Sequence, residues 1–369
     1  MTARLARLEA WIVRYPVVGP FKFFRPASDR PITRDTVVVK LTDDSGATGW
    51  GQSVPSPTWS YETVETVLST LELHLGPAVV GLDPADTGAV WRAMNRVIAN
   101  GFSTGQPIAK AGVDLALFDL VGRSRQVTPA QRWDRAPRGP VTLSWTVDVR
   151  SADAVGPELA AAAARGYRAF NVKAGTGLAS DLEVARELRR LAPAAFIWSD
   201  ANGAYDEASA VTLARHYADL GFAAFEQPLP ANHLPAYQTL RRLGALPILM
   251  DEGVVSLVDL QSFHQLGLLD GVAMKVSRSG GLTEARRMIT YLRNEGLHFF
   301  ASGLTDPDIA LAACLHLFAV EGLEHPAALN APQFLQGSIL ATPISVQGDQ
   351  AFPPDGPGLG VDVVHLQPQ

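Results

Sequence analysis

A repeated strand-then-helix pattern constrains the fold of this chain more than any other feature. From residue 141 to residue 327, short apolar strand-like runs alternate with helical stretches. About eight such units occur at roughly 25–30-residue spacing, which is typical of parallel strands joined by helical crossovers. No glycine-rich nucleotide fingerprint follows the first strand, so the pattern favours a closed α/β (β/α) barrel over an open doubly wound sheet. The last strand, near 323–327, has the weakest signal.

The segments on either side of the repeat have different patterns. Residues 1–50 are rich in the β-branched and aromatic residues of strands, and residues 60–125 carry apolar residues at helical spacing. We therefore predict an N-terminal α+β capping domain over 1–130 and a barrel domain over 131–334. The tail, 335–369, has strand-like pieces that cannot extend the barrel. We expect it to pack on the N-terminal domain and complete it.

Composition argues against several classes of protein. The net charge of −6, with no long basic run, argues against a nucleic-acid or membrane surface. No apolar stretch reaches the ~18 residues of a transmembrane helix, and the first residues lack the apolar core of a signal peptide. Cys314 is the only cysteine, so no intrachain disulfide can form. We expect a soluble, cytoplasmic protein that acts on a small molecule.

Each of five consecutive predicted strands ends in an ionisable residue. Lys173, Asp200, Glu226, Asp251 and Lys275 follow one another at spacings of 27, 26, 25 and 24 residues, which is the period of the repeat itself. Because the carboxyl ends of barrel strands open onto one face, we expect these side chains to converge there. The three carboxylates suit Mg²⁺, whereas the histidine or cysteine ligands of zinc are absent from these strand ends.

The two lysines flank the three carboxylates along the chain. A cation bound to a substrate carboxylate would stabilise the charge that forms when the α-proton leaves. A desolvated lysine near a cation has a lowered pKa and can act as the base. Lys173 and Lys275 are therefore the candidate acid–base pair.

Six sequence motifs together resemble the enolase superfamily, in its muconate-lactonizing subgroup, along nearly the whole chain. They are FNVKAG (170–175), SDANGAY (199–205), FEQPLP (225–230), MDEG (250–253), MKVSRSGGLTEARRM (274–288) and AKAGVDLALFDL (109–120). The resemblance implies a modified (β/α)7β barrel, Mg²⁺ bound by the three carboxylates, and the two lysines as acid and base. It also implies that the capping domain selects the substrate, here through the loop 19–31 and residues 53–59. Relatives are often dimers to octamers, so we expect a homo-oligomer.

One position departs from the pattern of this family. Relatives usually carry Lys-x-Lys at the second strand, whereas this chain has Asn171-Val172-Lys173. The missing lysine usually assists the second one electrostatically and can contact the substrate carboxylate. Two interpretations stay open: the pKa of Lys173 is less depressed, or Asn171 supplies a hydrogen bond to the substrate instead.

Several further residues have both a functional and a structural interpretation. Asp306 and Asp308 could pair with an ammonium or substituted amine of the substrate, although Asp308 is also placed to cap the following helix. Trp145 could form a wall of the pocket or fill the barrel. Lys22 and Arg25 could bind a distal substrate carboxylate or remain solvated surface groups.

Two residues beside the carboxylates are expected to support them. Asn202 lies in the turn after Asp200, where it either helps to hold the metal-ligating loop or only forms the turn. Glu252 follows Asp251 directly, and we expect it to support the ligands rather than to bind the ion.

These residues predict Mg²⁺-dependent abstraction of the α-proton of a carboxylate substrate through a metal-stabilised enediolate. The expected outcome is racemisation or epimerisation of an amino-acid derivative, or cycloisomerisation of a muconate-like acid. A dehydratase, such as one acting on a hydroxyproline, is the alternative. A catalytically silent barrel is disfavoured by the intact lysines and carboxylates. A metal hydrolase is disfavoured because no His-x-His ends a strand.

Overall fold

The structure, a computed structural model, describes residues 3–19, 21–24, 31–101, 103–364 and 366. Seven parallel strands form the wall of a barrel, in the order in which they occur along the chain. They are β5 (Trp145–Val147), β6 (Phe170–Lys173), β7 (Ile197–Asp200), β8 (Phe225–Glu226), β9 (Ile248–Met250), β10 (Gly271–Lys275) and β11 (His298–Ser302). Parallel bridges from Ser302 to Ala328 and from Ala327 to Leu143 join β11 to the chain just before β5. The predicted closed barrel is confirmed, with Ala327 and Ala328 as its short eighth strand.

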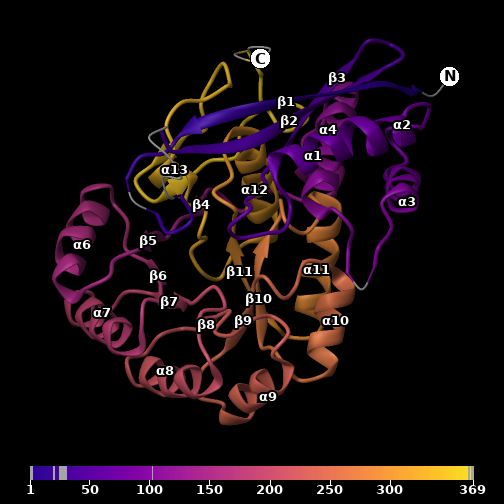
Figure 1. Ribbon diagram of the computed structural model, residues 1–369. Coiled ribbons are helices and arrows are strands. Elements are labelled where there is room, and N and C mark those ends of the chain that lie inside the picture. Colours follow the sequence, from indigo (N-terminus) through magenta and orange to yellow (C-terminus); the bar gives the residue numbers. More distant parts are fainter. Residues whose placement is uncertain (1–2, 20, 25–30, 102, 365, 367–369) are drawn as a thin grey trace.

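Helices cover the outside of this barrel (Figure 1). They are α6 (Val155–Ala164), α7 (Leu178–Leu191), α8 (Glu207–Asp219), α9 (Leu234–Leu243), α10 (Leu257–Gln265), α11 (Leu282–Asn294) and α12 (Asp308–Glu321), and the 3-10 turn η2 (Ala152–Ala154) precedes α6. Helix α11 buries Leu282, Ala285, Met288, Ile289 and Leu292, the single apolar stripe of a helix with one face in solvent. Helix α12 is buried on all sides, because it also contacts the capping domain through β3.

A small apolar cluster fills the inside of the barrel. It consists of Trp198, Ala224, Leu249, Phe300 and Ala328, all on or beside wall strands. The rings of Trp198 and Phe300 meet edge to face with centroids 5.5 Å apart. The barrel is therefore closed below its mouth, and polar side chains at the carboxyl ends of the strands lie above this cluster.

The capping domain is an antiparallel sheet with helices packed on it. The strands are β1 (Leu5–Pro16), β2 (Thr33–Asp43) and β3 (Thr48–Ser53). The helices are α1 (Val64–Thr70), the π-helix η1 (Leu71–Leu75), α2 (Gly76–Val79), α3 (Thr87–Val97), α4 (Pro107–Arg125) and α5 (Pro129–Arg132). Helix α4 lies against β3 with almost no space between them, since a Cβ on Gly51 would come within 1.9 Å of the Gly112 carbonyl oxygen.

The tail contacts both parts of the molecule (Figure 1). Its elements are α13 (Ala331–Phe334), β12 (Val346–Gln347) and β13 (Gln350–Ala351). Leu335 bridges Val17 beside β1, and the Leu359 backbone N–H donates to Asp119 of α4, in agreement with the packing predicted for the tail. The pairing of β13 with β4 (Val141–Thr142), before the first barrel strand, was not predicted. Within the described part of the chain, no helix combines the length and apolar character that crossing a bilayer requires.

Candidate active site

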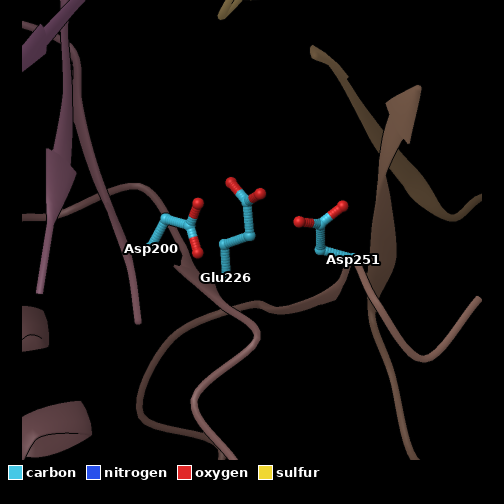
Figure 2. Close-up of side chains that lie close together, drawn as sticks. All are labelled: Asp200, Glu226 and Asp251. Atoms are coloured by element: carbon cyan, nitrogen blue, oxygen red, sulfur yellow. The ribbon is translucent and has the colours of Figure 1, made fainter. Parts of the chain in front are cut away.

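Three buried carboxylates meet at the mouth of the barrel. Figure 2 shows Asp200, Glu226 and Asp251 directed toward one region from the ends of β7, β8 and β9. One oxygen of each lies within 4.8 Å of the others. Asp200 and Asp251 are 0% exposed and Glu226 is 1% exposed. Buried carboxylates so close together repel one another unless positive charge lies beside them.

The electrostatics of the three carboxylates suit a divalent cation. Burial and the charge of Asp200 raise the pKa of Glu226 to about 8. Burial also acts to raise the pKa of Asp251, but Arg278 and Lys275 outweigh it and hold that pKa well below its usual range. Glu226 Oε1 and Asp251 Oδ2 accept no hydrogen bond from the described residues. An all-oxygen donor set with unused oxygens fits a hard divalent cation.

The two lysines approach the carboxylates from opposite ends of the group. Lys173 Nζ lies 2.5 Å from Asp200 Oδ2, and Lys275 Nζ lies 3.0 Å from Asp251 Oδ1. Lys275 also donates to Ser302 Oγ at 2.7 Å. Burial acts to lower the pKa of Lys173, but the charges of Asp200 and Glu226 outweigh it and raise the pKa. The pKa lowering expected from the sequence therefore requires that these carboxylates be neutralised.

The indole of Trp59 covers the space between the lysines. Its ring centroid lies 5.5 Å from Lys173 Nζ and 5.0 Å from Lys275 Nζ. The ring stacks on Phe23 with centroids 4.2 Å apart, and Nε1 donates to Glu252 Oε1 at 2.9 Å. The capping domain thus places the ring of Trp59, stacked on Phe23, over the two ammonium groups.

The N-terminal loop also reaches the site. Lys22 Nζ donates to the carbonyl oxygen of Ala174 at 3.3 Å, and the Lys22 backbone N–H donates to Asp148 Oδ2 at 2.6 Å. Burial lowers the pKa of Lys22, against the opposing effect of the Asp200 charge. Lys22 is therefore a half-buried cation beside Lys173. Arg25, the other cation singled out in this loop, lies outside the described residues.

Asn202 and Glu252 form a bridge next to the carboxylates. The Asn202 backbone N–H donates to Asp200 Oδ1 at 3.0 Å, and Asn202 Nδ2 donates to Glu252 Oε1 at 3.0 Å.

Asn171 lies on β6 in register with Thr146 and is 1% exposed. Neither its amide nitrogen nor its amide oxygen has a hydrogen-bond partner among the described residues.

Trp145 is not brought to the mouth of the barrel. Its Nε1 donates to Glu158 Oε1 of α6 at 2.5 Å, and its ring meets Tyr167 edge to face. The indole therefore packs between the barrel wall and the surrounding helices. It neither forms a wall of the pocket nor fills the barrel, the two alternatives that the sequence left open.

Asp306 and Asp308 have protein partners. Asp306 accepts from Ser277 Oγ at 2.5 Å and from the Leu304 backbone N–H at 2.8 Å. Asp308 accepts from the hydroxyl of Tyr15 at 2.8 Å, and from Ser338 Oγ and the Ile339 backbone N–H, at 2.7 and 2.9 Å. Asp308 does not cap α12, because Pro307 occupies the N-cap position and no side chain caps that end.

Three residues that hold the carboxylates or Lys275 in place were not singled out from the sequence. Arg278 donates to Asp251, and its side chain lines the cavity at the mouth. Gln227 Oε1 accepts from the backbone N–H groups of Asp251 and Gly253, at 2.8 and 3.2 Å, which fixes the loop that carries Asp251. Ser302 binds Lys275. The sequence feature that could have pointed to Arg278 is its position three residues after Lys275, within the motif at 274–288.

Comparisons with known proteins agree with this geometry. Residues 155–365 match the family model described as "Enolase C-terminal domain-like". Residues 16–131 match the N-terminal domain model of mandelate racemase and muconate lactonizing enzymes.

Individual relatives cover nearly the whole chain. Muconate cycloisomerase 1 of Rhodococcus opacus is 28% identical over 97% of this chain and 96% of its own length. The N-succinyl-L-Arg/Lys racemase of Bacillus cereus is 25% identical over 85% of this chain and 84% of its own. The crystal structure of 2-chloromuconate cycloisomerase from Rhodococcus opacus matches with a TM-score of 0.88 and 25% identity, over 98% of this chain and 97% of that one. The chain therefore belongs to the enolase superfamily, in its branch of mandelate racemase and muconate lactonizing enzymes.

Proposed function

We propose that the protein is a Mg²⁺-dependent isomerase that removes the α-proton of a small carboxylate substrate and returns a proton to the same intermediate. One observation carries this proposal. Lys173 and Lys275 contact the two outer members of the carboxylate group, Asp200 and Asp251, and both ammonium groups face the ring of Trp59. A substrate held beneath that ring would have one lysine on each side of its α-carbon.

The residues that would hold the ion are Asp200, Glu226 and Asp251. Held there, Mg²⁺ would neutralise these carboxylates and stabilise the negative charge that develops on the substrate as its α-proton leaves. With the carboxylates neutralised, burial dominates the pKa of Lys173 and lowers it, so that the amine can accept a proton.

The remaining groups orient the lysines and exclude water. Ser302 Oγ accepts a hydrogen bond from Lys275 Nζ and so fixes the direction of that ammonium. The stacked rings of Trp59 and Phe23 shield the reacting atoms from solvent. One lysine would take the proton from one face of the α-carbon and the other would deliver a proton to the opposite face, which inverts the centre.

The two isomerase outcomes differ in what the second lysine does. In racemisation or epimerisation of an amino-acid derivative, both lysines transfer protons. In cycloisomerisation of a muconate-like acid, one lysine protonates carbon and the other acts through its charge. The relatives include both kinds of enzyme, namely muconate cycloisomerase and N-succinyl amino-acid racemase.

The test is deuterium incorporation at the α-carbon. The purified protein with Mg²⁺ in D₂O is offered amino-acid derivatives, muconates and hydroxy acids, and the products are examined by mass spectrometry and chiral chromatography. A gain of one dalton with inversion is expected, as is the loss of exchange from one enantiomer in Lys173→Ala and from the other in Lys275→Ala. Lys40→Ala, a lysine of β2 remote from the site, is the matched control.

Two other results would change the conclusion. Loss of water from the substrate would establish a dehydratase. Absence of exchange with every acid, in a protein that also binds no divalent cation, would refute the proposal.

A further inference from the structure

The loop between β6 and α7 leads directly away from Lys173. It spans residues 174–177, and Lys173 is the last residue of β6. The Ala174 backbone N–H donates to the carbonyl oxygen of Asp200 at 2.8 Å, which extends the pairing of β6 with β7 by one residue. The sheet pairing ends there, so the course of the chain after Lys173 depends on the contacts of this loop.

The carboxylate of Asp181 binds the loop from within the same βα unit. Asp181 is buried and lies near the start of α7. Its Oδ2 accepts from the backbone N–H groups of Gly175, Thr176 and Gly177, at 3.0, 3.1 and 3.0 Å, and its Oδ1 accepts from Thr176 Oγ1 at 2.7 Å. Successive backbone N–H groups that converge on one point typically bind an anion. Here a carboxylate of the protein itself is that anion, and it gives the loop a fixed course.

The hydroxyl of Tyr205 reaches the same carboxylate from the neighbouring loop. Tyr205 is buried and follows Asp200 in the loop after β7. Its hydroxyl donates to Asp181 Oδ2 and accepts from the Gly175 backbone N–H at 2.9 Å. Burial, together with the charge of Asp181, raises the pKa of Tyr205 well above its usual range, so the hydroxyl keeps the proton that it donates. Tyr205 therefore connects the loop after Lys173 to the loop after Asp200.

The two loops lie in direct contact at Gly175. Its φ is +102°, which favours glycine, and a Cβ at this position would come within 2.6 Å of the Cβ of Ala204. A displacement of the loop after β6 would therefore move Lys173 relative to Asp200, because Asp200 belongs to the strand that precedes the second loop.

Lys275 depends on other contacts. It donates to Ser302 Oγ of β11 at 2.7 Å. The helix that follows it, α11, is held at its start by Asp114 of the capping domain, which accepts from the Thr283 backbone N–H at 3.0 Å. Strands β7, β8 and β9 lie between β6 and β10 in the barrel wall. The two lysines are therefore held by separate sets of residues.

We propose that Asp181 and Tyr205 are positioning residues for Lys173, which hold this lysine in place for proton transfer and leave Lys275 unaffected. Both act through residues 174–177 and not on the substrate. The inference rests on the proposed function in assigning a proton transfer to Lys173. If Asp181 and Tyr205 only stabilised the barrel, their loss would affect the two lysines equally.

The first test requires no catalysis. The metal-free wild type and Tyr205→Phe are treated with formaldehyde and a borane reductant, and the methylation rates of Lys173 and Lys275 are followed by peptide mass spectrometry. A hydrogen bond to a charged group corresponds to a factor of about ten or more in the equilibrium between the closed and the open loop. We therefore expect Lys173 to be methylated about tenfold faster in Tyr205→Phe, and Lys275 to be methylated at the wild-type rate.

The second test measures α-proton exchange in D₂O from each enantiomer separately. Tyr205→Phe is expected to slow exchange about tenfold or more for the enantiomer whose exchange Lys173→Ala abolishes, because a small displacement of a reacting group is costly. The other enantiomer should exchange at the wild-type rate. Asp181→Asn, which removes the charge that the loop binds, should show the same one-sided loss. Tyr291→Phe, which removes a hydroxyl hydrogen-bonded to His264 Nδ1, is the matched control and should change neither rate.

The outcomes separate this inference from the proposed function. Faster methylation of both lysines or of neither in Tyr205→Phe, or equal slowing of exchange from the two enantiomers, would overturn the positioning role. A wild type that exchanges no α-proton, with faster methylation of Lys173 alone in Tyr205→Phe, would keep the hold of Asp181 and Tyr205 on Lys173 and refute the proposed isomerase activity.

Discussion

The carboxyl group of Glu62 makes the stability of the capping domain depend on pH. Glu62 is 0% exposed and accepts hydrogen bonds from the backbone N–H groups of Ile108 and Ala109, at 2.7 and 2.9 Å, in the first turn of α4. Burial raises its pKa from 4.5 to about 7, against the opposing effect of these two hydrogen bonds. In the folded protein the Glu62 carboxyl group therefore keeps its proton up to a pH of about 7, whereas in the unfolded chain it loses the proton near pH 4.5.

The sign of the effect follows from proton linkage. Between pH 4.5 and pH 7 the folded state binds more protons than the unfolded state, so stability falls as the pH rises. The contribution is fully present below pH 4.5 and is lost as the pH rises through about 7. Since one pKa unit corresponds to ~1.4 kcal/mol, the whole change amounts to about 3 kcal/mol.

The assay is urea unfolding of the wild type and of Glu62→Gln across this pH range. Glutamine keeps one acceptor oxygen and does not titrate, so we expect the variant to lack this pH-dependent contribution. The wild-type free energy of unfolding minus that of the variant should fall by about 3 kcal/mol from pH 4.5 to pH 8. The subtraction removes the other titrating groups from the comparison. A difference that is constant with pH, or that rises, would refute the reasoning.

Three further predictions concern the ion, the capping domain and the barrel wall. Mg²⁺ at 100 times its dissociation constant should raise the free energy of unfolding by about 2.7 kcal/mol, measured by urea titration, and Asp251→Asn should lose most of that increase. Arg34 is 3% exposed and donates to the carbonyl oxygen of Leu304 at 2.8 Å. Arg34→Met should therefore lower the free energy of unfolding by ~3 kcal/mol or more. A variant as stable as the wild type would contradict this prediction. Trp145→Phe should lower the free energy of unfolding by ~1 kcal/mol, because the hydrogen bond to Glu158 is lost. The α-proton exchange rate should not change. A large loss of exchange in this variant would show that Trp145 belongs to the active site.

The regular repeat explains why so much could be predicted. Once the strands are recognised, parallel pairing brings their carboxyl ends to one face, so Lys173, Asp200 and Glu226 come together without knowledge of any loop. The catalytic and ligand roles given to these side chains stay predictions. So do the oligomeric state and the cellular location.

The residues that the sequence analysis misplaced or missed depend on the direction in which a side chain points or on contacts between residues distant in sequence. Barrel strands are buried on both faces, so the sequence around Trp145 shows no alternation that separates the inside from the helix-facing side. Asp308 binds the hydroxyl of Tyr15, 293 residues away, and no local pattern predicts such a partner. Arg278 lies in a turn after β10, where periodicity gives no direction to a side chain.

The carboxylate of Asp119 joins parts of the chain that are made at different times. It accepts from the Trp50 backbone N–H, from Arg123 and from the Leu359 backbone N–H, the last of these 240 residues later in the chain. Synthesis runs at about 5–20 residues per second, so α4 and the first three strands emerge from the ribosome more than ten seconds before Leu359. The barrel, made in between, is complete before the capping domain can be. During synthesis, the segment that carries Asp119 therefore waits for a contact made much later before its structure is complete.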